Sequence, residues 1–259
     1  MAFVEIESAR FRYELEGPPS GPVLMFSNSL GTDLRMWDAQ AAEFKQTFQV
    51  LRYDARGQGQ STISPGPYSI ELLVQDVVSL LDALRLQRVS FCGLSMGGMV
   101  GMMLAQKFPE RLDKLVLSST APKIGTAESW NTRIETVNAG GMKAVADGIL
   151  ERWFTPAFRS AGNLEPQTVR QMLMEASPTG YVACAAAVRD MDQREGIAAI
   201  RVPTLVISGS DDPVTPPADG RFVASKIAGA KYVELPAAHL SNIEAYRLFN
   251  EAVGRFFRA

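Results

Sequence analysis

A serine lies between two glycines at residues 93–97, Gly-Leu-Ser-Met-Gly, which match the pattern G-x-S-x-G. The apolar, partly β-branched residues 88–92 predict a buried strand before it, and a helical pattern follows to about residue 107. In such a strand-to-helix turn the hydroxyl of Ser95 is exposed at the carboxyl edge of a sheet, and the glycines leave room where side chains would collide. This context favours a nucleophilic serine over a chance match.

The serine needs a base, because a hydroxyl is a poor nucleophile at neutral pH. His239 is the only histidine of the chain. It lies in a loop that follows the last predicted strand, residues 231–235. We therefore predict that His239 takes the proton from Ser95 in an acyl-transfer reaction.

The acid that orients the base is one of two adjacent aspartates, Asp211 and Asp212, which follow the penultimate predicted strand. Asp212 is favoured by its spacing from Gly209 and by the proline after it. Asp211 would then cap the turn or face solvent. The chain order serine, aspartate, histidine is the order expected of α/β-hydrolases.

Backbone amides are the expected donors to the oxyanion of the reaction. One is the N–H of Met96, at the start of the helix after the serine. The other is expected in the loop after residues 22–27, and Leu30 is the favoured position. The Leu30 side chain could at the same time fill the pocket as an apolar group, because the oxyanion donor belongs to the backbone.

The elements that must position these residues alternate between apolar strands and amphipathic helices. This alternation predicts an α/β fold with a mostly parallel, eight-stranded sheet flanked by helices, and ligands bind at the carboxyl ends of such strands. The predicted strands are residues 3–6, 11–16, 22–27, 48–53, 88–92, 114–118, 203–208 and 231–235. The first pair predicts a hairpin, and residues 243–257 predict a last helix.

The alternation stops between residues 122 and 189, where several helical patterns follow one another. We expect this insertion, here called the cap, to cover the strand ends as a lid. The hydrolase-type core would then comprise residues 1–121 and 190–259.

The pair Gly57-x-Gly59 suggests a dinucleotide-binding loop only at first sight. The third glycine of that motif is replaced by Thr62, and a loop rich in proline and glycine follows instead of a helix. We reject this interpretation.

Composition excludes several classes of partner. The 26 Lys and Arg nearly balance the 28 Asp and Glu, so a nucleic-acid partner is not expected. No apolar run reaches the roughly 18 residues of a membrane span, and the first ten residues do not resemble a secretory signal. Cys92 and Cys184 are expected to be reduced core residues of a cytoplasmic protein, and no metal-ligand spacing is present.

Together, four stretches resemble the 3-oxoadipate enol-lactone hydrolases, bacterial enzymes of the α/β-hydrolase superfamily that belong to the β-ketoadipate pathway of aromatic degradation. These stretches are residues 28–37, 93–101, 209–217 and 238–244. The chain departs from the wider superfamily at Asn28-Ser29, where His-Gly is usual.

The resemblance implies a cofactor-free enzyme that opens a small carboxylated enol-lactone to 3-oxoadipate. A cation is then needed for the other carboxylate, and Arg133 lies one helical turn from Trp130 in the cap. The alternative is that Trp130 packs within the cap and Arg133 is a solvated surface charge. A general carboxylesterase or perhydrolase would share the triad, a ligand-sensing receptor of the same fold is a further alternative, and a homo-oligomer is compatible with the sequence.

Overall fold

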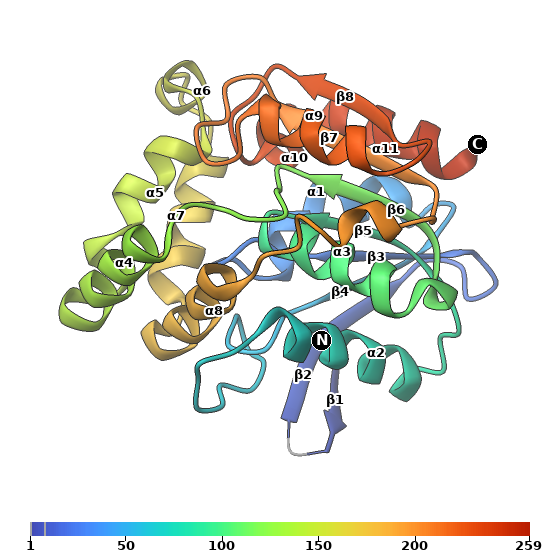
Figure 1. The fold of residues 1–259 in the computed structure, drawn as a ribbon, viewed down its shortest axis with the longest axis horizontal. Coiled ribbons are helices and arrows are strands. Elements are labelled where there is room, and N and C mark those ends of the chain that lie inside the picture. Colours follow the sequence, from blue (N-terminus) through green and yellow to red (C-terminus); the bar gives the residue numbers. More distant parts are fainter. Residues whose placement is uncertain (1, 8) are drawn as a thin grey trace.

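The computed structural model describes residues 2–7 and 9–259. Within these ranges the chain forms one eight-stranded sheet with the strand order β1-β2-β4-β3-β5-β6-β7-β8 (Figure 1). The strands are β1 (Ala2–Ile6), β2 (Ala9–Glu16), β3 (Val23–Ser27), β4 (Gln49–Tyr53), β5 (Val89–Leu94), β6 (Leu112–Ser118), β7 (Thr204–Gly209) and β8 (Lys231–Leu235).

Most neighbouring strands of the sheet are parallel. β2 is antiparallel to β1 and to β4, and the remaining pairs run parallel. The central strand β5 and the strand β7, which is second from the edge, are buried along their whole length, as expected for a sheet covered on both faces. The predicted α/β fold with a mostly parallel eight-stranded sheet is confirmed.

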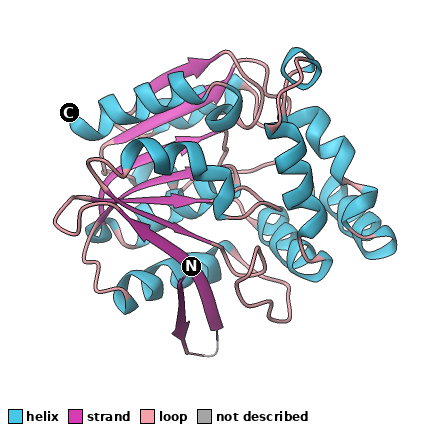
Figure 2. Ribbon diagram, turned by 180° about the vertical axis from the view of Figure 1, so that it is seen from behind, coloured by secondary structure: helices cyan, strands magenta, loops and turns pink. Residues whose placement is uncertain are grey.

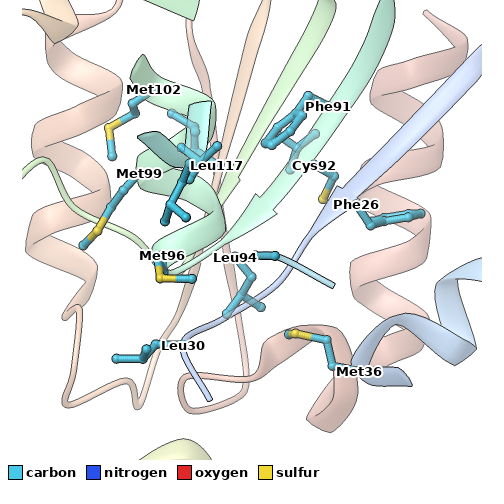
Figure 3. Close-up of a cluster of buried hydrophobic side chains, with 14 of the residues drawn as sticks. Phe26, Leu30, Met36, Phe91, Cys92, Leu94, Met96, Met99, Met102 and Leu117 are labelled. Atoms are coloured by element: carbon cyan, nitrogen blue, oxygen red, sulfur yellow. The ribbon is translucent and has the colours of Figure 1, made fainter. Parts of the chain in front are cut away.

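Helices cover both faces of the sheet (Figure 2). On one face α2 (Ile70–Ala83) packs against α3 (Met96–Lys107), and α9 (Pro217–Lys226) contacts β7. Elsewhere α1 (Asp38–Phe44) packs against α11 (Tyr246–Arg258). Met99 and Met102 of α3 are fully buried in this core (Figure 3).

The chain between β6 and β7 forms helices that gather beside one end of the sheet (Figure 1). They are α4 (Ala127–Gly140), α5 (Ala146–Trp153), α6 (Pro156–Ser160), α7 (Glu165–Glu175) and α8 (Pro178–Asp190). This segment contains the predicted cap, whose boundaries as a separate domain stay a prediction. In the described part of the chain, no helix is both long and apolar enough to cross a membrane.

Several predicted elements differ from the structure at their ends; β2 and β6, for example, each begin two residues earlier than predicted. Two other differences have a clear cause. β5 continues to Leu94 instead of ending at residue 92, because Leu94 still pairs with Ser118 of β6. The predicted helix 243–257 is interrupted at Ala245 (φ −114°, ψ 39°), between α10 (Ser241–Glu244) and α11. The short α10 is held separately, since Asn242 Nδ2 donates to the Met36 carbonyl at 2.9 Å.

Candidate active site

Ser95 occupies the turn between β5 and α3 in a conformation that side chains rarely adopt. Its φ is 56° and its ψ is −115°, and such strain costs about 1–3 kcal/mol. The surroundings hold the turn in place: the Ser95 N–H donates to the Ser118 carbonyl at 2.9 Å, and the Gly97 N–H donates to the Asn28 carbonyl at 3.0 Å. The turn is thus fixed to β6 on one side and to the loop after β3 on the other.

The glycines beside the serine are required by close backbone approach, as predicted from the motif. A Cβ at Gly93 would lie 2.2 Å from the Gly97 carbonyl oxygen. A Cβ at Gly97 would lie 2.2 Å from the Ser27 carbonyl oxygen, and one at Gly98 would meet the Thr120 side chain at 2.6 Å. These contacts let the start of α3 lie directly against the end of β3.

His239 and Asp212 form a buried pair beyond the ends of β7 and β8. His239 Nδ1 lies 2.8 Å from Asp212 Oδ2, and the two side chains are 1% and 0% exposed. Burial opposes the charge of Asp212, but the attraction of His239 and hydrogen bonds from His239 and Thr215 outweigh it and lower its pKa. An ionised carboxylate only accepts hydrogen bonds, so Nδ1 carries the proton and Nε2 is left as the basic nitrogen.

The structure separates the two candidate aspartates. Asp212 also accepts the N–H groups of Val214 at 2.7 Å and Thr215 at 3.1 Å, which fix its carboxylate toward His239. Asp211 is exposed, and its carboxylate accepts the Ser210 hydroxyl at 2.7 Å. Only Asp212 is placed to orient the imidazole.

A small cavity of about 30 Å³ brings together residues from the core and the cap. Ser95 and His239 both line it, and within the described ranges the Ser95 hydroxyl makes no hydrogen bond to another residue. The other lining residues are Ser29, Leu30, Met96, Ile124, Trp130, Arg133, Trp153, Tyr181, Val188 and Val214. The sequence-predicted site residues other than the buried Asp212 therefore share one cavity.

The backbone amides of Leu30 and Met96 are placed to bind an anion beside Ser95. Both residues line the cavity, and they lie at the same end of the sheet (Figure 3). Among the described residues neither amide N–H has a hydrogen-bond partner, whereas the neighbouring Gly31 and Gly97 N–H groups are both bonded. Two backbone donors without partners among the described residues, both in residues that line the cavity of Ser95, are what an oxyanion site requires.

Asn28, which departs from the usual superfamily sequence, stabilises this loop through its side chain. Its Nδ2 donates to the Tyr53 carbonyl at 2.9 Å, and its Oδ1 accepts the Trp37 indole N–H at 3.0 Å. The side chain is 1% exposed, so these buried hydrogen bonds hold the loop after β3 against Tyr53 and Trp37.

The cap places an aromatic wall and a cation over the cavity. Trp130 is 8% exposed, and its indole N–H donates to the Ile124 carbonyl at 2.7 Å. The guanidinium of Arg133 lies 4.9 Å from the Trp130 ring centroid. Arg133 is half-buried and forms no ion pair with any described carboxylate. A desolvated cation without an anion is a suitable partner for a carboxylate ligand.

Several neighbours of the site were not predicted from the sequence. Trp153 of α5 lies against His239, with ring centroids 6.1 Å apart, and the buried hydroxyl of Tyr181 faces Arg133. Burial and the nearby charge of Arg133 lower the pKa of Arg152, which adds a second cation to this part of the cap. No motif surrounds these residues, so the sequence alone carries no signal for their place in the site.

Glu244 connects the histidine loop to the cap. Its carboxylate accepts the Ala238 N–H at 2.9 Å and the Thr155 N–H at 3.2 Å, and it also accepts the Thr155 hydroxyl. Beside it, the Leu240 N–H donates to the Trp153 carbonyl at 3.1 Å. Leu240 is thus bonded directly to the end of α5, and Ala238 is connected through Glu244 to Thr155 just after it.

The cysteines do not take part in this arrangement. Both are free and buried. Burial raises the pKa of Cys92 well above its ordinary value and that of Cys184 to about 12, so each remains a neutral thiol at physiological pH.

A serine on a strained strand-to-helix turn, a buried histidine–aspartate pair and a mostly parallel sheet define the class of α/β-hydrolases. In agreement, a family model described as the alpha/beta hydrolase fold matches residues 22–140.

Similarity to known proteins extends over the whole chain. The chain is 40% identical over 247 residues to 3-oxoadipate enol-lactonase 2 of Acinetobacter baylyi, and the match covers 95% of this chain and 92% of the relative. The solved enol-lactonase of Burkholderia xenovorans LB400 superposes with a TM-score of 0.98 at 40% identity, covering 100% of both chains. A hydrolase of Pseudomonas aeruginosa PA01 gives a TM-score of 0.96 at 44% identity, covering 100% of this chain and 98% of that one. The chain belongs to the 3-oxoadipate enol-lactonase family and is an enzyme of the hydrolase class.

Proposed function

We propose that the enzyme hydrolyses 3-oxoadipate enol-lactone to 3-oxoadipate through an acyl-enzyme on Ser95. One observation carries this proposal: a single cavity is lined by Ser95, His239, Leu30, Met96 and the cation Arg133. The family to which the chain belongs supports the choice of an enol-lactone.

In each half-reaction of the proposed cycle, His239 acts first as a base and then as an acid. His239 Nε2 takes the Ser95 proton while Oγ attacks the lactone carbonyl, and the Leu30 and Met96 amides bind the resulting oxyanion. The ring C–O bond breaks, and the leaving enol oxygen receives the proton from His239. Water then attacks the acyl-enzyme with the same base, and the carboxylic acid and Ser95 hydroxyl are released.

The enol-lactone suits this site in two ways. Its ring opening expels an enolate, which is a better leaving group than an alkoxide, and ketonisation draws the reaction forward. Its free carboxylate would bind Arg133 under the wall formed by Trp130. The cavity of about 30 Å³ holds little more than one water molecule, so cap side chains must move outward when the lactone enters.

The proposal includes a cellular setting. The reaction as written needs no cofactor or metal, and its partner is a small carboxylated lactone, with no nucleic acid or membrane. We assign it to the β-ketoadipate pathway of aromatic degradation in the cytoplasm, where the buried free thiols of Cys92 and Cys184 would stay reduced. Growth on an aromatic substrate after deletion of the coding sequence, together with cell fractionation, tests this setting.

The decisive experiment compares kcat/KM for 3-oxoadipate enol-lactone with that for an uncharged ester of similar size. Ser95→Ala should abolish both activities. Arg133→Met should lower kcat/KM for the lactone by about 10- to 150-fold and spare the ester, because a hydrogen-bonded charge contributes about 1.5–3 kcal/mol. Arg159→Met is the matched control, since Arg159 is an exposed cap arginine.

A general carboxylesterase is the second candidate, since the triad and the oxyanion amides would serve any small ester. It would take precedence if the uncharged ester were the better substrate and Arg133→Met changed both rates equally. Binding of the lactone without turnover by the wild type would instead favour a receptor-like role.

A further inference from the structure

The loop at residues 54–61, which contains Gly57-x-Gly59, has no role in the cycle proposed above. It follows β4 at the carboxyl edge of the sheet and lies beside the loop that carries Leu30. Two hydrogen bonds join the loops: the Gly31 N–H donates to Gln58 Oε1 at 2.6 Å, and the Leu34 N–H donates to Asp54 Oδ1 at 2.8 Å. The loop therefore supports the oxyanion amide instead of binding a nucleotide.

Gln58 makes its bond at a cost to stability. Its side chain is 3% exposed, and among the described residues its Nε2 is buried without a hydrogen-bond partner. A buried unpaired donor costs about 1–3 kcal/mol, which an apolar side chain of equal length would avoid. A buried polar group retained at such a cost calls for an explanation beyond packing.

The position of Gly31 explains why its N–H needs a fixed partner. Its φ is +82°, and a Cβ there would lie 3.0 Å from Leu173 and Tyr181 of the cap. The peptide between Leu30 and Gly31 is thus confined between Gln58 on one side and the cap on the other. The Gly31 N–H belongs to the same peptide as the Leu30 carbonyl, so fixing it also fixes the backbone on the carboxyl side of Leu30, a residue that lines the cavity.

We infer that Gln58 is a positioning residue for the oxyanion site: its side-chain carbonyl fixes the Gly31 N–H and so aims the free N–H of Leu30 at the developing oxyanion. The inference rests on the proposed acyl-enzyme mechanism and adds a group that does not touch the substrate. A donor aimed at a charge that forms only in the transition state affects kcat more than KM.

Gln58→Met tests this inference, because methionine has a similar length but lacks a strong acceptor. It removes the unpaired Nε2 but leaves the Gly31 N–H without its acceptor, so the two effects on stability largely offset each other and the melting temperature should change little. We expect kcat to fall by about 10- to 100-fold while KM changes by less than about threefold. Gln60→Met is the matched control, because the Gln60 side chain is exposed in the same loop and Gln60 bonds to Asp54 only through its backbone N–H. The rates of Gln60→Met should equal those of the wild type.

A second readout separates positioning from a merely structural role. Butylboronic acid forms a tetrahedral adduct with a nucleophilic serine, whereas 3-oxoadipate binds as a planar product. Gln58→Met should weaken the boronic acid by about 10- to 100-fold and leave product inhibition within about threefold. Equal weakening of both ligands, or unchanged kcat and boronate affinity, would overturn the inference.

Gln58→Asn keeps the test decisive if the methionine variant does not fold. Asparagine carries the same groups one methylene further from Gly31, so an intermediate loss of kcat is expected, and wild-type kcat would refute the role. Ser95→Ala, measured in parallel, separates this failure from that of the proposed function: activity retained by Ser95→Ala would reject the acyl-enzyme itself, whatever Gln58 does.

Discussion

Replacing Asp212 with asparagine should lower kcat by about three orders of magnitude. The carboxylate lies 2.8 Å from His239 Nδ1, and both side chains are almost fully buried. When His239 becomes an imidazolium in the transition state, two unit charges about 4 Å apart attract by about 4 kcal/mol at an effective dielectric constant of about 20. Loss of that attraction corresponds to a factor of about 10³ in rate.

The asparagine also changes the proton on the imidazole. Its single oxygen can still accept the N–H groups of Val214 and Thr215, which leaves its NH₂ group facing His239. The Nδ1 atom must then accept a hydrogen bond, so Nε2 carries the proton and has no lone pair for Ser95. Both effects act on kcat, and substrate affinity should change little.

Steady-state hydrolysis of 3-oxoadipate enol-lactone by Asp212→Asn and Asp211→Asn is the assay, with thermal unfolding as the check on folding. Asp211→Asn should stay within about threefold of the wild type, since exposed substitutions away from a site have small effects. The reasoning fails if Asp212→Asn keeps more than about a tenth of the wild-type kcat, or if the two variants lose equal activity.

Three further predictions concern stability. Burial raises the pKa of Asp54 to about 6 from 3.8. As the pH rises, the unfolded chain therefore releases this proton before the folded chain does, and the free energy of unfolding falls by about 3 kcal/mol between pH 4 and pH 7. This fall in stability should be absent when the denaturation of Asp54→Asn is measured over the same pH range. Gly97→Ala should destabilise the fold by about 1–3 kcal/mol, because its Cβ would meet the Ser27 carbonyl oxygen at 2.2 Å. Gly148→Ala, which adds a Cβ in open space on α5, should instead stabilise the fold by about 0.4–1 kcal/mol. Urea denaturation measures both changes. Glu244→Ala should cost about 1–3 kcal/mol by leaving backbone donors unpaired. Glu244→Gln should recover only part of this in the same assay, because its NH₂ group cannot accept an N–H as the second carboxylate oxygen does.

Each of these predictions has a contrary outcome. A difference between wild type and Asp54→Asn that does not change with pH would mean that Asp54 titrates near its ordinary value. Equal responses of Gly97→Ala and Gly148→Ala would show that the close approach at Gly97 relaxes without cost. Equal stability of Glu244→Ala and the wild type would show that water replaces the carboxylate.

The sequence predicts those parts of the site that depend on local backbone chemistry or on a residue type that occurs only once in the chain. The turn at Ser95 needs glycines within two residues of it, and a chain with one histidine has one candidate base. The periodicity of apolar residues likewise predicts the strands and most helices. These signals are local, so they can be read without knowing the tertiary structure.

The rest depends on contacts between segments far apart in the chain. Gln58 matters because the loop after β4 meets the loop after β3, and Tyr181 matters because α8 lies over both. The break at Ala245 has the same origin, since α10 is held by bonds to Met36 and Ala238 that helical periodicity does not reveal. Even the choice between adjacent aspartates required the direction of a side chain.

The carboxylate of Glu244 couples the stability of the cap to that of the core. It belongs to α10 of the core, yet it binds Thr155 between α5 and α6 as well as the residue before His239. The cap therefore cannot detach without breaking hydrogen bonds that hold the histidine loop. Heat inactivation and loss of cap structure should accordingly be one cooperative event, so a partly unfolded enzyme with an open site and a competent base would not accumulate.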